Sequence, residues 1–351
     1  MNYTGQGPPR KLQKHDDDFL QLNDQLNDSI VAKATSILGQ FLNREDAKLT
    51  KVQIDTITSV MDGKNTFVVD GVGSGKSFMY LIPSILMLQQ HQRLQIKDKA
   101  LAIVLSPLIS LISDQVIQYG PGAKSLGIAL CALTSLTKEI EKARIMRELE
   151  NGTIGILYVS PEMFVSLLQF ILLHRKVVMV AVDEAHTFVT FGHNFRPAFL
   201  HLPRAFAALS NPVVLLLTGT ATLPMIEDIT KAFNISKSVL SYTPRLNIVQ
   251  EMVKVDGMSV MEVEKSKLEI IRQCAKIRKY GPGIVVVSFK KEADNIARQG
   301  NEFYSKSDGM QFYSYHAGHT ADEKEAVMGK LMATGVHSGV VVVCTIYTIY
   351  S

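Results

Sequence analysis

The chain has 351 residues, of which 46% are hydrophobic and 20% charged, with a formal net charge of +4. This length and apolar content allow a core in each of two domains and exclude a wholly disordered protein. The small basic excess is compatible with a polyanionic partner but does not identify one. Three scattered cysteines exclude a disulfide framework and a zinc ribbon. Because no apolar run approaches the roughly 20 residues that cross a bilayer, we expect an intracellular protein with no membrane partner.

The first part of the chain, residues 1–44, is predicted to hold a disordered tail and one helix. Residues 1–16 are rich in glycine, proline and polar side chains, a composition typical of disorder. Between residues 17 and 41 apolar side chains recur every three or four positions, which predicts an amphipathic helix that packs on the next part of the chain.

Residues 45–241 alternate short β-branched runs with helical segments. The runs are apolar almost throughout, which is typical of parallel strands with helices on both faces. The predicted strands are residues 67–70, 101–106, 127–133, 154–160, 177–183 and 213–219, and the connection between the last two reads as a proline-rich loop. Helices are predicted to begin near Lys76, Pro107, Lys138, Pro161 and Met225. This part is therefore predicted to be one α/β domain.

Residues 242–351 begin a second series of the same kind. Helices are predicted for residues 261–280 and from Lys290 and Ala321, and strands for residues 284–289, 311–316 and 339–345. Only three strands of this second sheet are expected, so the second domain is predicted to be a partial copy of the first.

A glycine-rich turn joins the first strand of residues 45–241 to a helix in the sequence FVVDGVGSGKS. Its glycines let backbone N–H groups approach phosphate oxygens, and the helix N-terminus favours negative charge. Lys76 is expected to meet the β and γ phosphates of ATP, and Ser77 to hold Mg²⁺. Asp70 occupies the first position of the strict GxxxxGK[ST] pattern. The candidate nucleotide-binding residues of this loop are Gly73, Ser74, Gly75, Lys76 and Ser77.

A second candidate element is the acidic strand end in VVMVAVDEAH. Asp183 and Glu184 follow a buried strand, at the edge where ligands of parallel sheets collect. Asp183 is expected to hold Mg²⁺ and Glu184 to polarise the water that attacks the γ phosphate, with His186 placed to sense that phosphate. Alone, such a pair is more often a solvated turn, but together with the phosphate loop it predicts ATP hydrolysis.

The sequence DEAHTFVTFGHNFRPAF, residues 183–199, resembles the RecQ family of DNA helicases, whose corresponding aromatic-rich loop couples DNA binding to ATP hydrolysis. Other motifs of that family occur in order along the chain: LTKVQIDTI, LSPLISLISDQV, YVSPE, LTGTAT, PRLN, VVSFKK and YHAG. The resemblance covers about residues 45–345. It implies two RecA-like parallel-sheet lobes with helices on both faces, the second lobe being incomplete.

The resemblance also implies roles for individual residues. Gln53 would recognise adenine, with ATP and Mg²⁺ as cofactors, and the partner would be single-stranded or forked DNA. Aromatic faces stack on exposed bases, and an arginine pairs with phosphate or with the adjacent lobe. The implied nucleic-acid contacts are Ser106, Ser110, Gln115, Phe188, Phe191, His193, Phe195, Arg196 and His316. The implied location is the nucleus in a eukaryote and the cytoplasm otherwise.

The sequence departs from the family pattern at several places. Thr50 stands where a basic residue is usual, Asp70 puts a carboxylate beside the phosphate loop, and Phe191 replaces a usual tryptophan. After residue 345 the chain reads IYTIYS, where the family continues toward an arginine finger worth roughly 10³ to 10⁵ in turnover. We therefore expect ATP binding with hydrolysis that is weaker than is usual in the family.

The sequence thus predicts an ATP-dependent DNA helicase of the RecQ type that moves 3′ to 5′ along a single strand, in DNA repair and recombination. One alternative is a weak or inactive nucleotide- and DNA-binding remnant, and another is a DEAH-type RNA helicase. His316 and His319 are not predicted to bind a metal, because the sequence offers no third ligand nearby.

Overall fold

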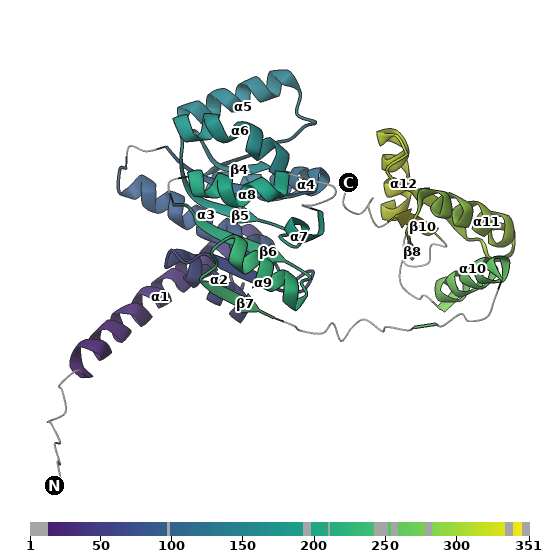
Figure 1. The fold of residues 1–351 in the computed structure, drawn as a ribbon, viewed down its shortest axis with the longest axis horizontal. Helices are drawn as coiled ribbons and strands as arrows, with labels where there is room; N and C mark the ends of the chain where they lie inside the picture. Colours follow the sequence, from purple (N-terminus) through teal and green to yellow (C-terminus); the bar gives the residue numbers. More distant parts are fainter. Residues whose placement is uncertain are drawn as a thin grey trace, which may run out of the picture. The chain divides into compact units, whose positions relative to one another are not determined.

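The computed structural model describes residues 13–96, 99–191, 198–209, 211–241, 252–253, 259–277, 283–333 and 340–345. The chain divides into two compact units, Met1–Pro244 and Arg245–Ser351. Each unit has its own sheet (Figure 1). Among the described residues, the sheet of the first unit has seven strands and that of the second has three. Within the described residues, no helix has the length and apolar content needed to cross a membrane.

The seven-stranded sheet of the first unit has the order β3-β4-β2-β5-β6-β1-β7. Neighbouring strands pair in parallel along this order. Because the strands all run in the same direction, their carboxyl ends lie at one edge of the sheet. The strands are β1 Thr66–Val69, β2 Ala100–Leu105, β3 Ala129–Leu133, β4 Ile154–Val159, β5 Lys176–Val182, β6 Val213–Thr218 and β7 Lys237–Leu240.

Local sequence signals begin the helices of this unit. A capping box between Thr50 and Gln53 begins α2, and the Ser160 side chain followed by Pro161 begins α6. The helices are α1 Gln13–Leu42, α2 Lys51–Met61, α3 Lys76–Arg93, α4 Ile109–Ser125, α5 Glu139–Asn151, α6 Pro161–His174, α7 Thr187–Phe191, α8 Ala198–Ala208 and α9 Leu223–Ala232.

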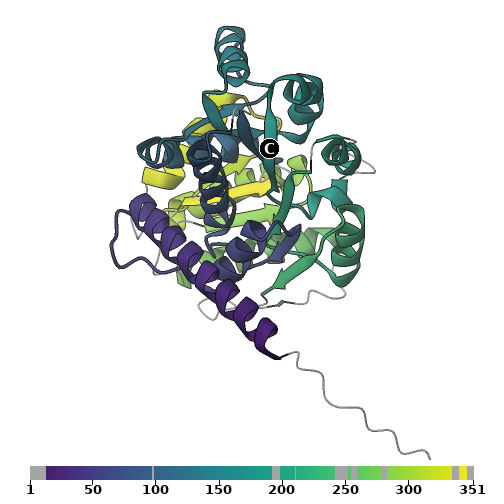
Figure 2. The same cartoon turned by 90° about the vertical axis from the view of Figure 1, so that its left-hand side faces the viewer.

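Side chains of the sheet alternate between two cores, one on each face. Leu101, Ile103 and Leu105 of β2 belong to one core, while Ala102 and Val104 belong to the other. This period of two results from the pleat of a strand. Helices α5, α6, α8 and α9 contribute to the first core, and α1 to α4 contribute to the second. Helices therefore cover both faces of the sheet, as the sequence predicts (Figures 1 and 2).

Most predicted elements of the first unit are confirmed, with two corrections. The amphipathic helix predicted for residues 17–41 is confirmed within α1, whereas residues 1–12 lie outside the described residues. Strand β7 was not predicted, because only Val239 among its residues is buried and the segment has no apolar run. The predicted proline-rich loop between β5 and β6 is wrong, since this segment contains α7 and α8. Pro203 lies inside α8, where burial of its apolar neighbours offsets the helix-breaking cost of proline.

The second unit contains a parallel sheet in the order β8-β10-β9. Val287, Phe312 and Val343 of the sheet pack with Leu268 and Ile296 of two helices to form its core. The three strands that the sequence predicts for this unit are confirmed. They are β8 Gly283–Val287, β9 Gln311–Tyr315 and β10 Val340–Thr345, and the helices are α10 Val260–Ile277, α11 Lys290–Asp308 and α12 Ala321–Ala333.

A buried arginine joins the amino ends of several strands in the first unit. Arg175 directly succeeds α6, and its guanidinium donates to the carbonyls of Lys99, Ala100, Leu149 and Ile154 at 2.9, 2.6, 3.1 and 2.6 Å. Burial lowers the pKa of Arg175 to about 10, so the side chain remains charged at neutral pH. A planar group with several donors is suited to such a set of acceptors.

We expect Arg175→Met to lower the free energy of unfolding by on the order of 3 kcal/mol, because it leaves several carbonyls without their donors. Thermal melting of the purified chain measures this loss as a drop of several degrees. The exposed Arg147 of α5 offers a matched control in Arg147→Met. Equal melting temperatures for the two variants would contradict the claim that the hydrogen bonds of Arg175 stabilise the fold.

Candidate nucleotide and strand-binding site

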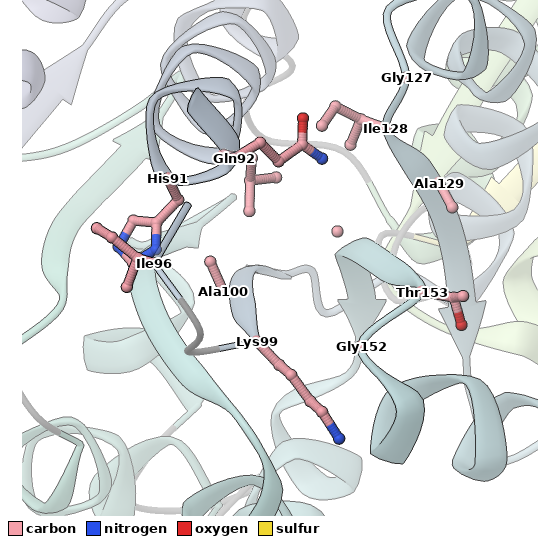
Figure 3. Close-up of a pocket in the computed structure, with 12 residues that line it drawn as sticks. His91, Gln92, Ile96, Lys99, Ala100, Gly127, Ile128, Ala129, Gly152 and Thr153 are labelled. Carbon is pink, nitrogen blue, oxygen red and sulfur yellow. The ribbon is translucent and has the colours of Figure 1, made fainter. Parts of the chain in front are cut away.

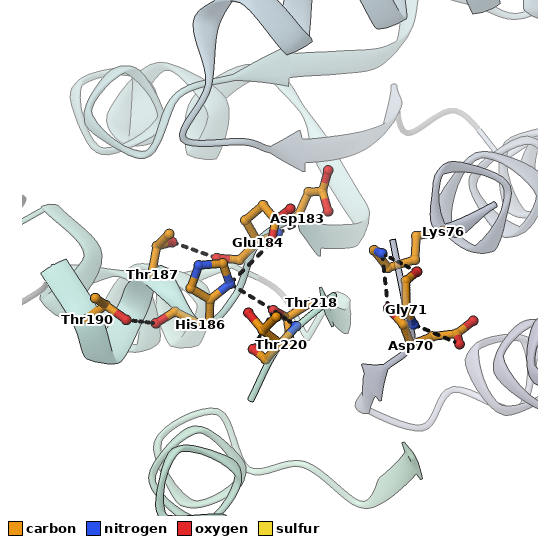
Figure 4. A network of polar contacts seen from close by, with 10 residues as sticks. All are labelled: Asp70, Gly71, Lys76, Asp183, Glu184, His186, Thr187, Thr190, Thr218 and Thr220. Carbon is orange, nitrogen blue, oxygen red and sulfur yellow. Dashed lines mark hydrogen bonds and ion pairs between the residues drawn. The ribbon is translucent and has the colours of Figure 1, made fainter. Parts of the chain in front are cut away.

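The candidate nucleotide site lies at the carboxyl edge of three neighbouring strands. β1, β6 and β5 are adjacent in the sheet, and they are followed by the phosphate loop, the sequence LTGTAT and the acidic strand end. Segments far apart in sequence thereby meet at the edge where open parallel sheets bind their ligands. Figure 4 shows the polar contacts within these segments.

The phosphate loop has the backbone conformation that its glycines predict. Gly73 and Gly75 have φ angles of +81° and +80°, in the left-handed region that favours glycine. Gly75 is the N-cap of α3, so the first backbone N–H groups of that helix face the loop. Backbone donors at a helix N-terminus are suited to an anion. The loop is therefore shaped for phosphate, as the sequence predicts.

Lys76 is held within this loop by backbone carbonyls. Its Nζ donates to the carbonyl oxygens of Asp70 at 3.1 Å and Gly71 at 2.9 Å. The Asp70 carboxylate accepts a hydrogen bond from the Gly71 N–H at 3.0 Å and points away from the Lys76 ammonium (Figure 4). The unusual residue at position 70 therefore bonds to the loop backbone and does not neutralise Lys76.

Ser74 supplies a polar atom that has no protein partner. Its Oγ is buried and makes no hydrogen bond among the described residues. An orphaned buried hydroxyl costs free energy, and a missing ligand or water is a common explanation. Its position in the phosphate loop supports a bound polar group at this point.

Gln53 fastens α2 to the phosphate loop. Its Oε1 accepts from the Thr50 N–H at 2.9 Å, and its Nε2 donates to the carbonyls of Ser74 at 3.4 Å and Gly75 at 3.3 Å. Both ends of the amide are thus bonded within the protein, and adenine recognition by Gln53 stays a prediction. The structure also explains Thr50, whose Oγ1 accepts from the Gln53 N–H at 3.2 Å and caps α2.

The two carboxylates after β5 differ in their environments. Burial and the charge of Glu184 raise the pKa of Asp183 to about 6, although Lys76 and His186 act in the opposite direction. Burial acts to raise the pKa of Glu184 as well. The hydrogen bond from His186 and the charges of His186 and Lys76 outweigh burial, so the pKa of Glu184 is lowered. Glu184 has a φ angle of +52°, and its N–H donates to Asp183 Oδ1 at 3.0 Å. Adjacent carboxylates with separated pKa values are typical of catalytic sites.

His186 connects the acidic strand end to the end of β6. Its Nδ1 lies 2.8 Å from Thr218 Oγ1 and 3.2 Å from Glu184 Oε2. Because Thr218 Oγ1 donates to the Thr220 carbonyl at 2.9 Å, it accepts its hydrogen bond from His186 Nδ1–H. Thr218 is a site residue that the sequence analysis did not single out, and the signal for it was a threonine at the end of an apolar strand.

Three of the residues that the resemblance implies to contact DNA lie in or near α4, and their environments differ. Ser110 is exposed in the first turn of α4, as contact with a strand requires. Ser106 is buried after β2, where its Oγ accepts from the Leu108 N–H at 3.5 Å. Gln115 is buried and accepts a hydrogen bond from the Tyr80 hydroxyl at 2.8 Å. In this conformation Ser110 faces solvent, whereas Gln115 serves the interior between α3 and α4.

Most of the aromatic-rich loop lies outside the residues whose side chains the structure describes. This holds for Phe191, His193, Phe195 and Arg196, whose roles stay predictions. Phe188 is described: its ring meets that of Phe233 edge to face, with centroids 5.0 Å apart, and packs on the core. Stacking of Phe188 on a base would require this packing to open.

His316 in the second unit is buried and bonded through both ring nitrogens. Its Nε2 lies 2.9 Å from Asp294 Oδ1, and its Nδ1 accepts from the Gly318 N–H at 3.2 Å. The expectation of no third ligand was wrong, because Asp294 of α11 lies with His316 and His319 in a group whose ligand atoms are within 4.8 Å. The rings of His316 and His319 are tilted by 33° with centroids 4.0 Å apart, and protein groups already contact both ring nitrogens of His316. This arrangement supports a structural role for His316.

A small cavity lies at the amino ends of strands in the first sheet, and Figure 3 shows the residues that line it. It has a volume of about 140 Å³ and is lined by residues at the amino ends of strands, including Ala100 of β2 and Ala129 of β3. His91 also lines it, and the buried Nδ1 of that side chain has no hydrogen-bond partner among the described residues. The cavity is therefore separate from the phosphate loop.

Comparison with known families identifies the first unit. The family described as "DEAD/DEAH box helicase" matches residues 50–231, which include the phosphate loop and the DEAH sequence. The chain belongs to the DEAD/DEAH box helicase family. Lys76, Asp183 and Glu184 all lie within the matched residues.

Among curated proteins, the chain is similar to helicases of the RecQ type. It is 30% identical over 300 residues to "ATP-dependent DNA helicase RecQ" of Pasteurella multocida, covering 84% of this chain and 42% of that protein. It is 29% identical to the RecQ of Bacillus subtilis, covering 84% and 45%. Identity to "ATP-dependent DNA helicase Q-like 5" of Arabidopsis thaliana is 26%, covering 95% and 36%. The chain spans less than half the length of these three relatives.

Solved helicase structures share the fold. The DEAD-box helicase Mss116, bound to single-stranded RNA, aligns with a TM-score of 0.66 at 17% identity, covering 88% of this chain and 63% of that one. The helicase MrfA, bound to DNA and AMPPNP, aligns with a TM-score of 0.62 at 18% identity, covering 88% and 43%. The predicted pair of RecA-like parallel-sheet lobes is confirmed at the level of fold.

The chemistry of the site fits the magnesium triphosphate that the sequence predicts. Hard oxygen ligands suit Mg²⁺, and the Ser77 hydroxyl with the Asp183 carboxylate would supply them. The orphaned hydroxyl of Ser74 and the ammonium of Lys76 suit phosphate oxygens. The burial that raises the pKa of Asp183 would be offset by a bound cation.

We expect Asp183→Asn to stabilise the nucleotide-free protein at pH 7.5, because the buried carboxylate is then charged at a cost. The gain should be on the order of 2 kcal/mol. A pKa of about 6 in the folded protein, above the ordinary value for aspartate, means that the native state gains stability as pH falls from about 6 to 4. The difference in unfolding free energy between Asp183→Asn and the unaltered chain should therefore shrink as the pH falls from about 6 to 4.

Thermal melting at pH 7.5, 6.0 and 4.5 measures this effect, with Asp114→Asn on the exposed surface of α4 as the control. An asparagine variant that melts lower at pH 7.5, or keeps its full advantage at pH 4.5, would count against a strained carboxylate at residue 183.

We also expect Gly75→Ala to destabilise the phosphate loop. Its φ angle of +80° strains any L side chain, and a Cβ would lie 2.7 Å from Gln53 Nε2. The expected loss is about 1–2 kcal/mol of unfolding free energy, together with weaker nucleotide binding. Melting curves and nucleotide titrations measure the two effects.

Two substitutions in the same loop separate the causes. Gly73→Ala meets no atom within 4 Å but keeps the strained φ angle, whereas Gly71→Ala meets nothing and has no positive φ angle. The expected order of damage is Gly75→Ala, then Gly73→Ala, then Gly71→Ala. Equal effects at all three positions would refute the role assigned to the Gln53 contact.

Proposed function

We propose that this chain is the ATP-dependent motor part of a DNA helicase of the RecQ type. It would couple ATP hydrolysis to movement along single-stranded DNA. The observation that carries this proposal is the junction of three strands, where Lys76, the Asp183 and Glu184 pair and the Thr218 contact to His186 meet at one edge. Membership of the DEAD/DEAH box helicase family and similarity to RecQ helicases support it.

Each residue of the site would have a distinct task in the reaction. Lys76 would bind the β and γ phosphates, and the backbone N–H groups of the loop would orient them. Glu184 has a lowered pKa, so it is charged at neutral pH and suited to orient the attacking water. Ser77 and Asp183 would hold Mg²⁺, whose chemistry is to neutralise charge that develops on the phosphate oxygens.

The link between hydrolysis and movement would pass through His186. The imidazole Nδ1 lies near both Glu184 Oε2 and the hydroxyl of Thr218, at the end of β6. A change at the phosphate would therefore displace a neighbouring segment directly. Movement would be 3′ to 5′ with unwinding of forked DNA, in repair and recombination, and the protein would be nuclear in a eukaryote. These finer assignments are proposals that rest on the resemblance to RecQ helicases.

We expect ATP turnover by the whole purified chain to rise at least tenfold on addition of single-stranded DNA. Lys76→Ala should reduce kcat/KM for ATP by about 10²-fold or more, because it removes charge stabilisation from the transferred phosphate. Steady-state turnover with and without DNA measures both effects. The exposed Lys51 provides a matched control in Lys51→Ala.

The same assay distinguishes the alternatives. Turnover stimulated by single-stranded RNA in preference to DNA would favour an RNA helicase, and nucleotide binding without turnover would favour an inactive binding module. If Lys76→Ala leaves turnover unchanged, the assigned site does not carry the activity.

A further inference from the structure

The side-chain amide of Gln53 is bonded to the protein at both ends. Its Oε1 accepts from the Thr50 N–H at 2.9 Å, and its Nε2 donates to the carbonyls of Ser74 at 3.4 Å and Gly75 at 3.3 Å. A donor at one end and two acceptors at the other fix the orientation of the amide, because the reverse orientation would bring its oxygen against carbonyl oxygens. Gln53 thus joins the start of α2 to the phosphate loop that precedes α3.

These bonds occupy the groups with which a glutamine recognises adenine. Such recognition requires the amide to accept from the N6 amino group of the base and to donate to its N7. The donor end of Gln53 faces the carbonyls of Ser74 and Gly75, and the residue is only 4% exposed. A nucleotide bound at the loop would therefore meet no exposed amide donor at Gln53.

Thr50, the other polar residue at the start of α2, does not select adenine either. Its Oγ1 accepts from the Gln53 N–H at 3.2 Å and caps α2, while the residue as a whole is exposed. A hydroxyl can donate or accept, so it would tolerate both the amino group of adenine and the corresponding oxygen of guanine. Gln53 and Thr50 together present no donor and acceptor pair that fits one base.

The contacts that the loop does offer suit the triphosphate. The Lys76 ammonium, the first N–H groups of α3 and the buried Ser74 hydroxyl, which has no partner among the described residues, are all suited to phosphate oxygens. ATP, GTP and UTP share these oxygens. Gln53 acts on this set indirectly, because it bonds to the backbone of Ser74 and Gly75.

We propose that Gln53 is a positioning residue of the phosphate loop, and that the site takes purine and pyrimidine nucleoside triphosphates with little selection of the base. A site built to hydrogen-bond one substrate group can reject analogues that lack the group by roughly 10⁴-fold, whereas a site without that contact discriminates far less. This inference rests on the proposed function, because it names the substrate class of that same site, in which ATP is one member.

The affinities of the whole purified chain for different bases decide the proposal. The probes are the β,γ-imido analogues of ATP, GTP and UTP with Mg²⁺, and isothermal titration calorimetry measures each dissociation constant. We expect the three constants to agree within about tenfold. A preference for the ATP analogue of more than tenfold over either of the others would overturn the proposal.

Gln53→Met tests the positioning role, because it keeps a side chain of similar size and removes the bonds to the loop. We expect the affinities for the three analogues and for inorganic tripolyphosphate to fall by one common factor, about fivefold or more. A loss confined to the ATP analogue would show that Gln53 recognises adenine, and unchanged affinities would show that it does not position the loop. Either result would overturn the proposal.

Thr50→Ala is the matched control, since it removes the other half of the capping box and leaves the bonds from Gln53 to the loop. Both variants should melt lower than the unaltered chain, but Thr50→Ala should keep all four affinities within about twofold. Equal losses of affinity in the two variants would mean that Gln53 acts only through the stability of α2, which would overturn its positioning role. If Gln53→Met does not fold, the three analogues on the unaltered chain still decide the selection of the base.

Failure of this inference is distinguishable from failure of the proposed function. If the unaltered chain binds no nucleotide, both are wrong. If ATP binds and its turnover is stimulated by single-stranded DNA, while the GTP and UTP analogues bind more than tenfold more weakly than the ATP analogue, the proposed function stands and this inference is overturned.

Discussion

The site depends on holding two carboxylates side by side at the buried end of β5. Asp183 is buried at the carboxyl end of β5, where burial and the charge of the neighbouring Glu184 raise its pKa to about 6. Such a pair is tolerated because Lys76 and His186 lie close enough to oppose the negative charge. The free protein carries an electrostatic strain that a bound cation would relieve, so stability is sacrificed at the place where function is proposed.

The sheet order explains why these residues meet. β6 lies between β1 and β5, so the segment after β6 stands between the phosphate loop and the acidic pair. Thr218, at the end of β6, bonds to His186, and Lys76 is retained by the carbonyls of Asp70 and Gly71. Backbone carbonyls thus accept both of these hydrogen bonds from Lys76. Phosphate oxygens would have to replace these carbonyls when nucleotide binds.

Sequence reasoning predicted the sheet and the phosphate loop because both have strong local signals. Buried strands are continuous apolar runs, and the left-handed Gly73 and Gly75 are what a phosphate loop requires. It missed β7, whose residues have little burial of their own. It also predicted a loop where α8 lies, because proline disfavours a helix, whereas burial of apolar side chains in α8 outweighs the cost of Pro203. It could not place Gln115 or His316, since which face of an element a polar residue occupies depends on partners distant in sequence.

The most direct measurement of the central claim is a crystal structure of the whole chain with Mg²⁺ and a non-hydrolysable ATP analogue. We predict that Lys76 Nζ leaves the carbonyls of Asp70 and Gly71 for phosphate oxygens, with Ser77 and Asp183 at the cation and the Ser74 hydroxyl no longer without a partner. A nucleotide bound elsewhere, or a phosphate loop that keeps Lys76 on its own carbonyls beside bound nucleotide, would contradict this claim.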